Sequence, residues 1–255
     1  MSISTDRKIA VVTGAAMGIG MAIARQLARD GLIVLVSDLD EAKAAETAAG
    51  LREEGGSAEP LGLDVSSPAS IAAAFAEVEE RYGRCDVVVN NAGIARTFPF
   101  LDFPLDSFVA TMNVNVTGAL LCSQHAARLM VRHRWGRIVT IASVAGMRSV
   151  GSGRTAYGTS KAAVIGLTRQ MASELAEFGI TANAVAPGPV DTPMTKLLHS
   201  VEFRGAYTAA IPMKRYGTPE EIASLVSFLA SDHAAYITGA AIPIDGGFMA
   251  AGALG

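Results

Sequence analysis

The chain has 255 residues, a formal net charge of −3 and two cysteines, and 50% of its residues are hydrophobic. These values suit a large buried core and disfavour a disulfide scaffold, a zinc site, or a surface for nucleic acid or anionic membranes. We therefore expect a small-molecule substrate as the partner. The polar start at residues 1–8, and the lack of an apolar run near the roughly 18 residues of a membrane span, predict a cytoplasmic protein.

Apolar, β-branched runs alternate with alanine-rich stretches of helical periodicity, which is typical of βαβ units. The expected strands cover residues 8–13, 32–37, 58–63, 86–89, 136–141, 180–185 and 240–244. The expected helices cover residues 18–30, 41–54, 68–82, 105–132, 155–178 and 219–230. With right-handed crossovers, this order predicts an α/β fold: a single-domain doubly wound (Rossmann) sheet of about seven parallel strands with helices on both faces.

No linker, charge block or internal repeat divides the sequence, so residues 1–255 are expected to form one dinucleotide-binding and catalytic domain. Residues 192–216 mix apolar and charged side chains and have no strand partner. Two interpretations stay open for this segment: a lid over the site, or a pair of surface helices.

A glycine-rich sequence, TGAAMGIG, spans residues 13–20 between the first expected strand and the first helix. Small residues let the backbone approach a pyrophosphate, and the helix N-terminus offers free N–H groups to it. The alternative is an ordinary tight turn.

Asp38 ends the second expected strand, 24 residues after Gly14. An acidic residue near this offset accepts hydrogen bonds from the adenosine ribose and repels a 2′-phosphate, which favours NAD over NADP. No Lys or Arg at residues 15–17 or 39 offsets that repulsion. The alternative role is a helix N-cap or loop carboxylate, for which Asp40 competes.

Polar residues follow the third and fourth expected strands, at the edge where open α/β sheets bind ligands. Asp64 can accept from an adenine amino group, and Asn90, Ala92 and Gly93 are expected to line the nucleotide path. Either motif could instead be a turn.

Tyr157 and Lys161 stand four residues apart in an expected helix and so share one face. A lysine cation beside the phenol should lower the pKa of Tyr157 from about 10, making it a candidate acid or base. Taken alone, such a pair also arises by chance on solvated helices.

In combination, the motifs TGxxxGIG, NNAG and YxxxK resemble the short-chain dehydrogenase/reductase family over essentially the whole chain. The resemblance implies a catalytic tetrad of Asn115, Ser143, Tyr157 and Lys161, with Asn113 as the rival asparagine. The sequence from Asp245 onward also resembles the family's C-terminal segment, and the resemblance implies a homotetramer. Physically, Asn115 can hold a water that relays protons to Lys161, and Ser143 can hold the reacting oxygen.

Combining the resemblance with the motifs gives the expected NAD contacts, which come from the strand ends and the residues just after them. They are Gly14, Met17, Gly18, Ile19, Gly20, Asp38, Leu39, Asp64, Val65, Asn91, Ala92, Gly93, Tyr157, Lys161, Pro187, Gly188, Val190 and Thr192. No metal site is expected, because the four histidines have no paired spacing.

Three arginines fall in segments expected to form the substrate pocket. Arg96, Arg148 and Arg154 can bind an anionic or polyhydroxylated substrate beside Ser143 and Tyr157, or they can be exposed or paired across an interface.

The activity expected is NAD-dependent interconversion of a secondary alcohol and a ketone, or of a sugar hemiacetal and a lactone. The substrate preferred is a sugar, polyol or other polar metabolite. One alternative is a 3-oxoacyl-[acyl-carrier-protein] reductase, which the sequence at residues 211–221 also resembles. The remaining alternative is a protein that senses NAD without turnover.

Overall fold

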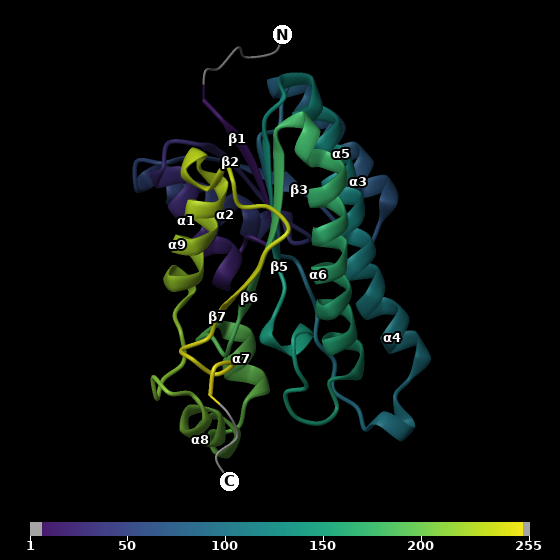
Figure 1. Cartoon of the computed structure of the whole chain (residues 1–255). Helices are drawn as coiled ribbons and strands as arrows, with labels where there is room; N and C mark the ends of the chain where they lie inside the picture. The colour runs from purple at the N-terminus through teal and green to yellow at the C-terminus, as the bar shows by residue number, and fades with distance from the viewer. Residues whose placement is uncertain (1–6, 252–255) are drawn as a thin grey trace.

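The strands assemble into one parallel sheet, with helices covering both faces, as the sequence predicted (Figure 1). The computed structural model describes residues 7–251, without the side chains of residues 194 and 198. The strands are β1 (Ile9–Thr13), β2 (Ile33–Asp38), β3 (Ser57–Gly62), β4 (Val87–Asn90), β5 (Gly136–Ile141), β6 (Ile180–Pro187) and β7 (Ala241–Ile244). The sheet order is β3-β2-β1-β4-β5-β6-β7, so β1 and β4 flank the point where the strand order reverses.

The helices form two layers, as Figure 1 shows. One layer contains α1 (Gly18–Arg29), α2 (Glu41–Glu53) and α9 (Pro219–Ala230), and the other contains α3 (Pro68–Tyr82), α5 (Gly118–His133) and α6 (Thr155–Leu175). Every residue of β1, β4, β5 and β6 is buried between them. This explains why these strands are almost continuously apolar, since a parallel sheet hides both of its faces.

The predicted helix at 105–132 is wrong in one respect, because it is divided into two. α4 (Leu105–Met112) and α5 are joined by a π-helical turn, Asn113–Thr117, in which Asn115 is buried. A π turn is rare inside α-helices and is found mostly at functional sites. It has no periodic sequence signal, because the apolar pattern continues on both sides.

By length and composition alone, the run Leu105–His133 could cross a membrane. A core helix meets the same criteria, and α5 packs Cys122, Ala126 and Met130 into the core cluster that lies between the sheet and the helices on this face. The run is therefore weak grounds for a membrane span.

The segment 192–216 contains two short helices, α7 (Pro193–Leu198) and α8 (Val201–Ala210). Both lie at the lower end of the molecule in Figure 1, near the carboxyl ends of the strands. Thr192 caps α7 through a reciprocal hydrogen-bond pair with Thr195. The pair of helices is therefore observed, and its action as a lid stays a prediction.

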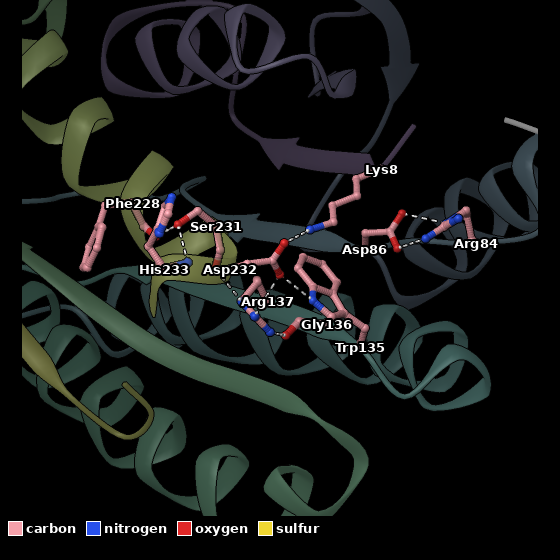
Figure 2. A network of polar contacts seen from close by, with 10 residues as sticks. All are labelled: Lys8, Arg84, Asp86, Trp135, Gly136, Arg137, Phe228, Ser231, Asp232 and His233. Atoms are coloured by element: carbon pink, nitrogen blue, oxygen red, sulfur yellow. Dashed lines mark hydrogen bonds and ion pairs between the residues drawn. The ribbon is translucent and has the colours of Figure 1, made fainter. Parts of the chain in front are cut away.

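A polar network ties the opposite end of the sheet together (Figure 2). Asp232, just after α9, accepts from Lys8 at 3.1 Å and from the Trp135 indole at 2.9 Å. Buried Arg137 lies over the Trp135 ring, 4.3 Å from its centroid, and donates to the carbonyl of Ser231 at 3.1 Å. These contacts hold the starts of β1 and β5 against α9, far from the strand ends that carry the predicted site.

Candidate active site

A cavity of about 540 Å³ opens at the carboxyl ends of the strands. All the residues predicted to contact the cofactor lie on its wall, as do Ser143, Arg96 and Arg154. Asn90, Asn115 and Arg148 are the predicted site residues that the structure does not place on this wall. One cavity thus brings together residues from positions 14 to 192, which is the arrangement expected at a topological switch point.

The glycine-rich turn is shaped by its glycines and by Asn91. Gly14 has a φ of +62°, in the left-handed region that favours glycine. The side-chain amide of Asn91 donates to the carbonyls of Thr13 and Gly14, at 2.9 Å each. A Cβ on Gly20 would stand 2.2 Å from the Gly14 carbonyl oxygen. Gly20 therefore lets α1 pack closely against the turn, and the N-terminus of α1 opens on the cavity, where its free N–H groups suit a pyrophosphate.

Replacing Gly20 with Ala is expected to destroy this turn. The new Cβ would clash with the Gly14 carbonyl oxygen and lie 2.5 Å from the Asn91 amide nitrogen. We expect loss of NADH binding and a destabilisation of about 1–3 kcal/mol, the usual range for overpacking.

Gly50→Ala is the matched control, because Gly50 lies inside α2 with open space around it. It should stabilise the fold by about 0.5–1 kcal/mol. Chemical unfolding and NADH fluorescence titration measure both effects; unchanged binding in Gly20→Ala would contradict the assignment.

Asp38 and Asp40 divide the two roles that the sequence left open. Asp40 is the N-cap of α2 and accepts from the Lys43 N–H at 3.1 Å. Asp38 lies on the cavity wall and accepts from the backbone N–H groups of Ala16 at 3.1 Å and Asp40 at 3.2 Å. Its carboxylate is therefore fixed against the glycine-rich turn. Leu39 beside it is exposed.

The expectation that Asn90 lines the nucleotide path is wrong. Asn90 is buried in the core and donates to the Ser123 hydroxyl at 2.9 Å. Its neighbour Asn91 reaches the cavity instead, because successive side chains of a strand point to opposite faces. Asp64 lies on the cavity wall, where one of its carboxylate oxygens already accepts from the N–H and hydroxyl of Ser66.

The predicted lowering of the Tyr157 pKa by Lys161 is also wrong for the cofactor-free protein. Burial raises the pKa of Tyr157, and the smaller opposing influences are a hydrogen bond with Ser143 and the charge of Arg154. The Lys161 ammonium lies 5.7 Å from the centroid of the Tyr157 ring. It donates instead to the carbonyl of Ile141, at 2.7 Å.

Burial also lowers the pKa of Lys161 to about 8. Desolvation penalises the charged form of any buried amine, and Lys161 has no carboxylate beside it among the described residues to compensate. Tyr157 and Lys161 are thus both shifted toward their neutral forms. Groups with perturbed pKa values inside a cleft are typical of catalytic sites.

Asn115 supports the site from behind the wall. Its side-chain oxygen accepts from the Ile94 N–H at 2.8 Å, and its amide donates to the Ile94 carbonyl at 3.0 Å and to the Ser160 hydroxyl at 2.9 Å. The π turn presents Asn115 to both partners. Asn115 therefore fixes the loop after β4 against α6, and both of its amide hydrogens are engaged by these two partners. The role as a water holder stays a prediction.

The substrate end of the cavity contains residues that the sequence did not single out. His199 and Tyr207, from the segment 192–216, lie on the wall together with Arg154. Arg148 instead lies over the Phe248 ring, 5.1 Å from its centroid. No sequence signal marked His199, which has no histidine or carboxylate at a ligand spacing. Within residues 7–251, no group of three or more His, Cys, Asp or Glu side chains is placed to hold a metal ion.

Comparisons with known proteins agree with this geometry. A family model described as enoyl-(acyl carrier protein) reductase matches residues 14–249. The 3-oxoacyl-[acyl-carrier-protein] reductase of Aquifex aeolicus (strain VF5) is 40% identical over 250 residues, covering 98% of this chain and 100% of that protein. The corresponding reductase of Pseudomonas aeruginosa is 42% identical over 244 residues, covering 96% of this chain and 98% of that protein.

A similar solved structure is that of a gluconate 5-dehydrogenase from Burkholderia cenocepacia J2315 in complex with NADP and tartrate. It superposes with a TM-score of 0.92 at 35% identity and covers 98% of both chains. Since the family model and these relatives span nearly the whole sequence, the chain belongs to the short-chain dehydrogenase/reductase family, oxidoreductases of CH–OH and keto groups that bind a nicotinamide cofactor.

Proposed function

We propose that this protein interconverts a secondary alcohol and a ketone with NAD as the cofactor. The observation that carries the proposal is that Asp38, Ser143, Tyr157 and Lys161 all line one cavity. Among the described residues that line this cavity, Tyr157 is the one titratable hydroxyl that burial desolvates and that has a lysine beside it.

Each side chain has a definite role in this reaction. When bound, the nicotinamide ring accepts or returns a hydride. Tyr157 donates its proton to the ketone oxygen in the reduction direction, and its phenolate accepts the alcohol proton in the oxidation direction. Ser143 lines the same cavity as Tyr157 and is expected to hold the same substrate oxygen. Lys161 supplies a cation behind Tyr157 and is expected to bind the nicotinamide ribose.

The preference for NAD rests on Asp38. Its carboxylate is held by two backbone N–H groups, and Lys43, the nearest lysine to it in the sequence, is paired with Asp40 at 2.9 Å. A ribose diol can donate to that carboxylate, whereas a 2′-phosphate would be repelled. The gluconate 5-dehydrogenase of similar structure was solved with NADP, so the fold alone does not favour NAD and the proposed preference depends on Asp38.

Replacing Asp38 with Ala is expected to reduce the preference for NAD over NADP. Wild-type kcat/KM should favour NAD over NADP by about 100-fold or more. In the variant this ratio should fall at least tenfold, which corresponds to about 1.4 kcal/mol. Glu53→Ala is the control, since this exposed carboxylate at the end of α2 lies off the cavity wall and should not alter the ratio. Steady-state kinetics with both cofactors measures the effect; a wild-type enzyme that prefers NADP would overturn the proposal.

Two substrate classes are candidates. The curated relatives favour a 3-oxoacyl thioester, because reductases of that name match the full chain at 40–42% identity. They support this alternative better than the sugar, polyol or other polar metabolite expected from the sequence. The second class keeps specific support from Arg154 on the cavity wall and from the likeness to a gluconate 5-dehydrogenase solved with tartrate.

A substrate screen separates the two classes. NADH oxidation would be followed with acetoacetyl thioesters and with keto acids and ketoses, and NAD reduction with polyols, hydroxy acids and sugars, lactone formation included. A kcat/KM at least tenfold higher for thioesters would assign the first class, and the reverse would assign the second. The homotetramer, the cytoplasmic location and the absence of nucleic-acid or membrane partners stay predictions.

A further inference from the structure

The substrate end of the cavity carries a cation without a counterion. Arg154 is half-buried on the cavity wall and forms no ion pair with any carboxylate in the described part of the chain. Its guanidinium contacts the His199 ring nitrogen at 3.2 Å and lies over the Phe203 ring, 5.7 Å from the centroid. Burying a charge without a partner is costly, and a carboxylate is the ligand that best satisfies a guanidinium.

His199 fixes the direction of that guanidinium. Because arginine can only donate, Nε2 of His199 must accept, and the neutral ring then carries its proton on Nδ1. Nδ1 lies 3.1 Å from the Tyr216 hydroxyl, whose oxygen can accept a hydrogen bond from the Nδ1–H group. Burial and the charges of Arg154 and Arg204 lower the pKa of His199 and so keep the ring neutral.

Aromatic contacts hold the His199 ring in place. Phe203 packs edge-on against it with centroids 4.7 Å apart, and Tyr207 stacks with it at 6.1 Å. Tyr207 in turn stacks on Phe248 at 5.6 Å. The segment 192–216 and the C-terminal segment therefore together position the imidazole that orients Arg154.

Arg154 is also close to the reacting atoms. It immediately precedes α6, three residues before Tyr157, and its charge is felt by the Tyr157 phenol. A short substrate can therefore place its carbonyl or hydroxyl carbon at Tyr157 and an anionic group at Arg154. Asp38 and Asp64, the two acidic residues of the cavity wall, lie at the strand ends expected to bind the nucleotide.

We propose that Arg154, positioned by His199, binds a carboxylate of the substrate, so that the preferred substrates are short hydroxy or keto acids, sugar acids included. This inference rests on the proposed function, because it assigns the substrate class of the same cavity. It also gives the helices α7 and α8 a function, since His199, which completes the anion site, stands in the short connection between them.

The test is a calorimetric measurement of the binding of malonate, and of neutral malonamide, to the full-length protein saturated with NAD. Wild-type protein should bind malonate at least tenfold more tightly than malonamide. Arg154→Gln should weaken malonate binding by tenfold to a hundredfold and leave malonamide unchanged. Lys196→Gln, which removes an exposed cation from α7, is the matched control and should change neither.

Two further variants separate positioning from folding. Arg154→Lys keeps the charge and should retain part of the malonate preference. His199→Phe removes the nitrogen that accepts from Arg154 and should weaken malonate binding about threefold to tenfold, whereas His199→Gln, which keeps an acceptor, should recover most of it. Equal binding of the two probes by wild-type protein, or equal loss of both in Arg154→Gln, would overturn the inference.

The binding readout needs no turnover, so the two proposals can fail separately. Arg154-dependent malonate binding in a protein that reduces no ketone would retain the carboxylate site and reject the oxidoreductase. Turnover of neutral ketones or thioesters without a preference for malonate would retain the oxidoreductase and reject the carboxylate site.

Discussion

Tyr157→Phe is expected to lower kcat by about 100-fold to 10,000-fold, the range over which a positioned acid or base contributes. The Tyr157 side chain is half-buried on the cavity wall, and the variant removes only its hydroxyl. Packing should therefore survive, and NADH affinity should stay within about threefold. Steady-state kinetics and fluorescence titration measure the two quantities.

Tyr236→Phe is the control for this substitution, because Tyr236 is fully exposed and its hydroxyl should contribute nothing. Retained turnover in Tyr157→Phe would mean that another group transfers the proton. A wild-type protein that binds NAD but turns over no compound of a broad panel would instead favour the NAD-sensing alternative.

Lys161→Met is expected to lower turnover by about 100-fold or more and to change the pH dependence of stability. Lys161 is buried, and its pKa falls from 10.5 to about 8. The folded protein therefore releases this proton before the unfolded chain does. Between pH 8 and 10.5 the unfolded state binds more protons at this site, so the contribution of Lys161 to wild-type stability rises with pH in that window.

The rise is expected to be about 2–3 kcal/mol, at about 1.4 kcal/mol for each pKa unit. It should be absent from Lys161→Met, so the difference in unfolding free energy between the two proteins should change by about 2 kcal/mol from pH 8 to pH 10. Urea unfolding at both pH values measures it. Lys196→Met, which alters an exposed lysine, should follow the wild type. Parallel pH profiles for wild type and Lys161→Met would show that the buried amine is not desolvated.

The sheet and the glycine-rich turn were predictable because their signals are local. β5 begins and ends at the residues expected, since its apolar run lies between Gly136 and Ser143. The grouping of the predicted cofactor residues around one cavity was predictable, because parallel strands end at one edge of the sheet.

The errors concern properties that depend on tertiary contacts. Burial has the largest effect on the pKa of Tyr157, and no pattern in the sequence shows how far a helix face is shielded from water. Arg148 and Arg154 look equivalent in the sequence, yet Arg148 lies on Phe248 and Arg154 faces the cavity. His199 was missed because its partners, Arg154 and Tyr216, stand 45 and 17 residues away.

The π turn at Asn113–Thr117 makes the number of residues between α4 and α5 as important as their identity. A π turn holds one residue more than an α-helical turn, so deleting one residue here would let a regular α-helix run from α4 into α5 with little rotation between them. The helices would keep their places, but the turn that presents Asn115 to Ile94 and Ser160 would be lost. A single-residue deletion should thus preserve the fold and remove the contacts that join the loop after β4 to α6. The catalytic wall depends on a counted length of chain, which an alignment by residue type alone would overlook.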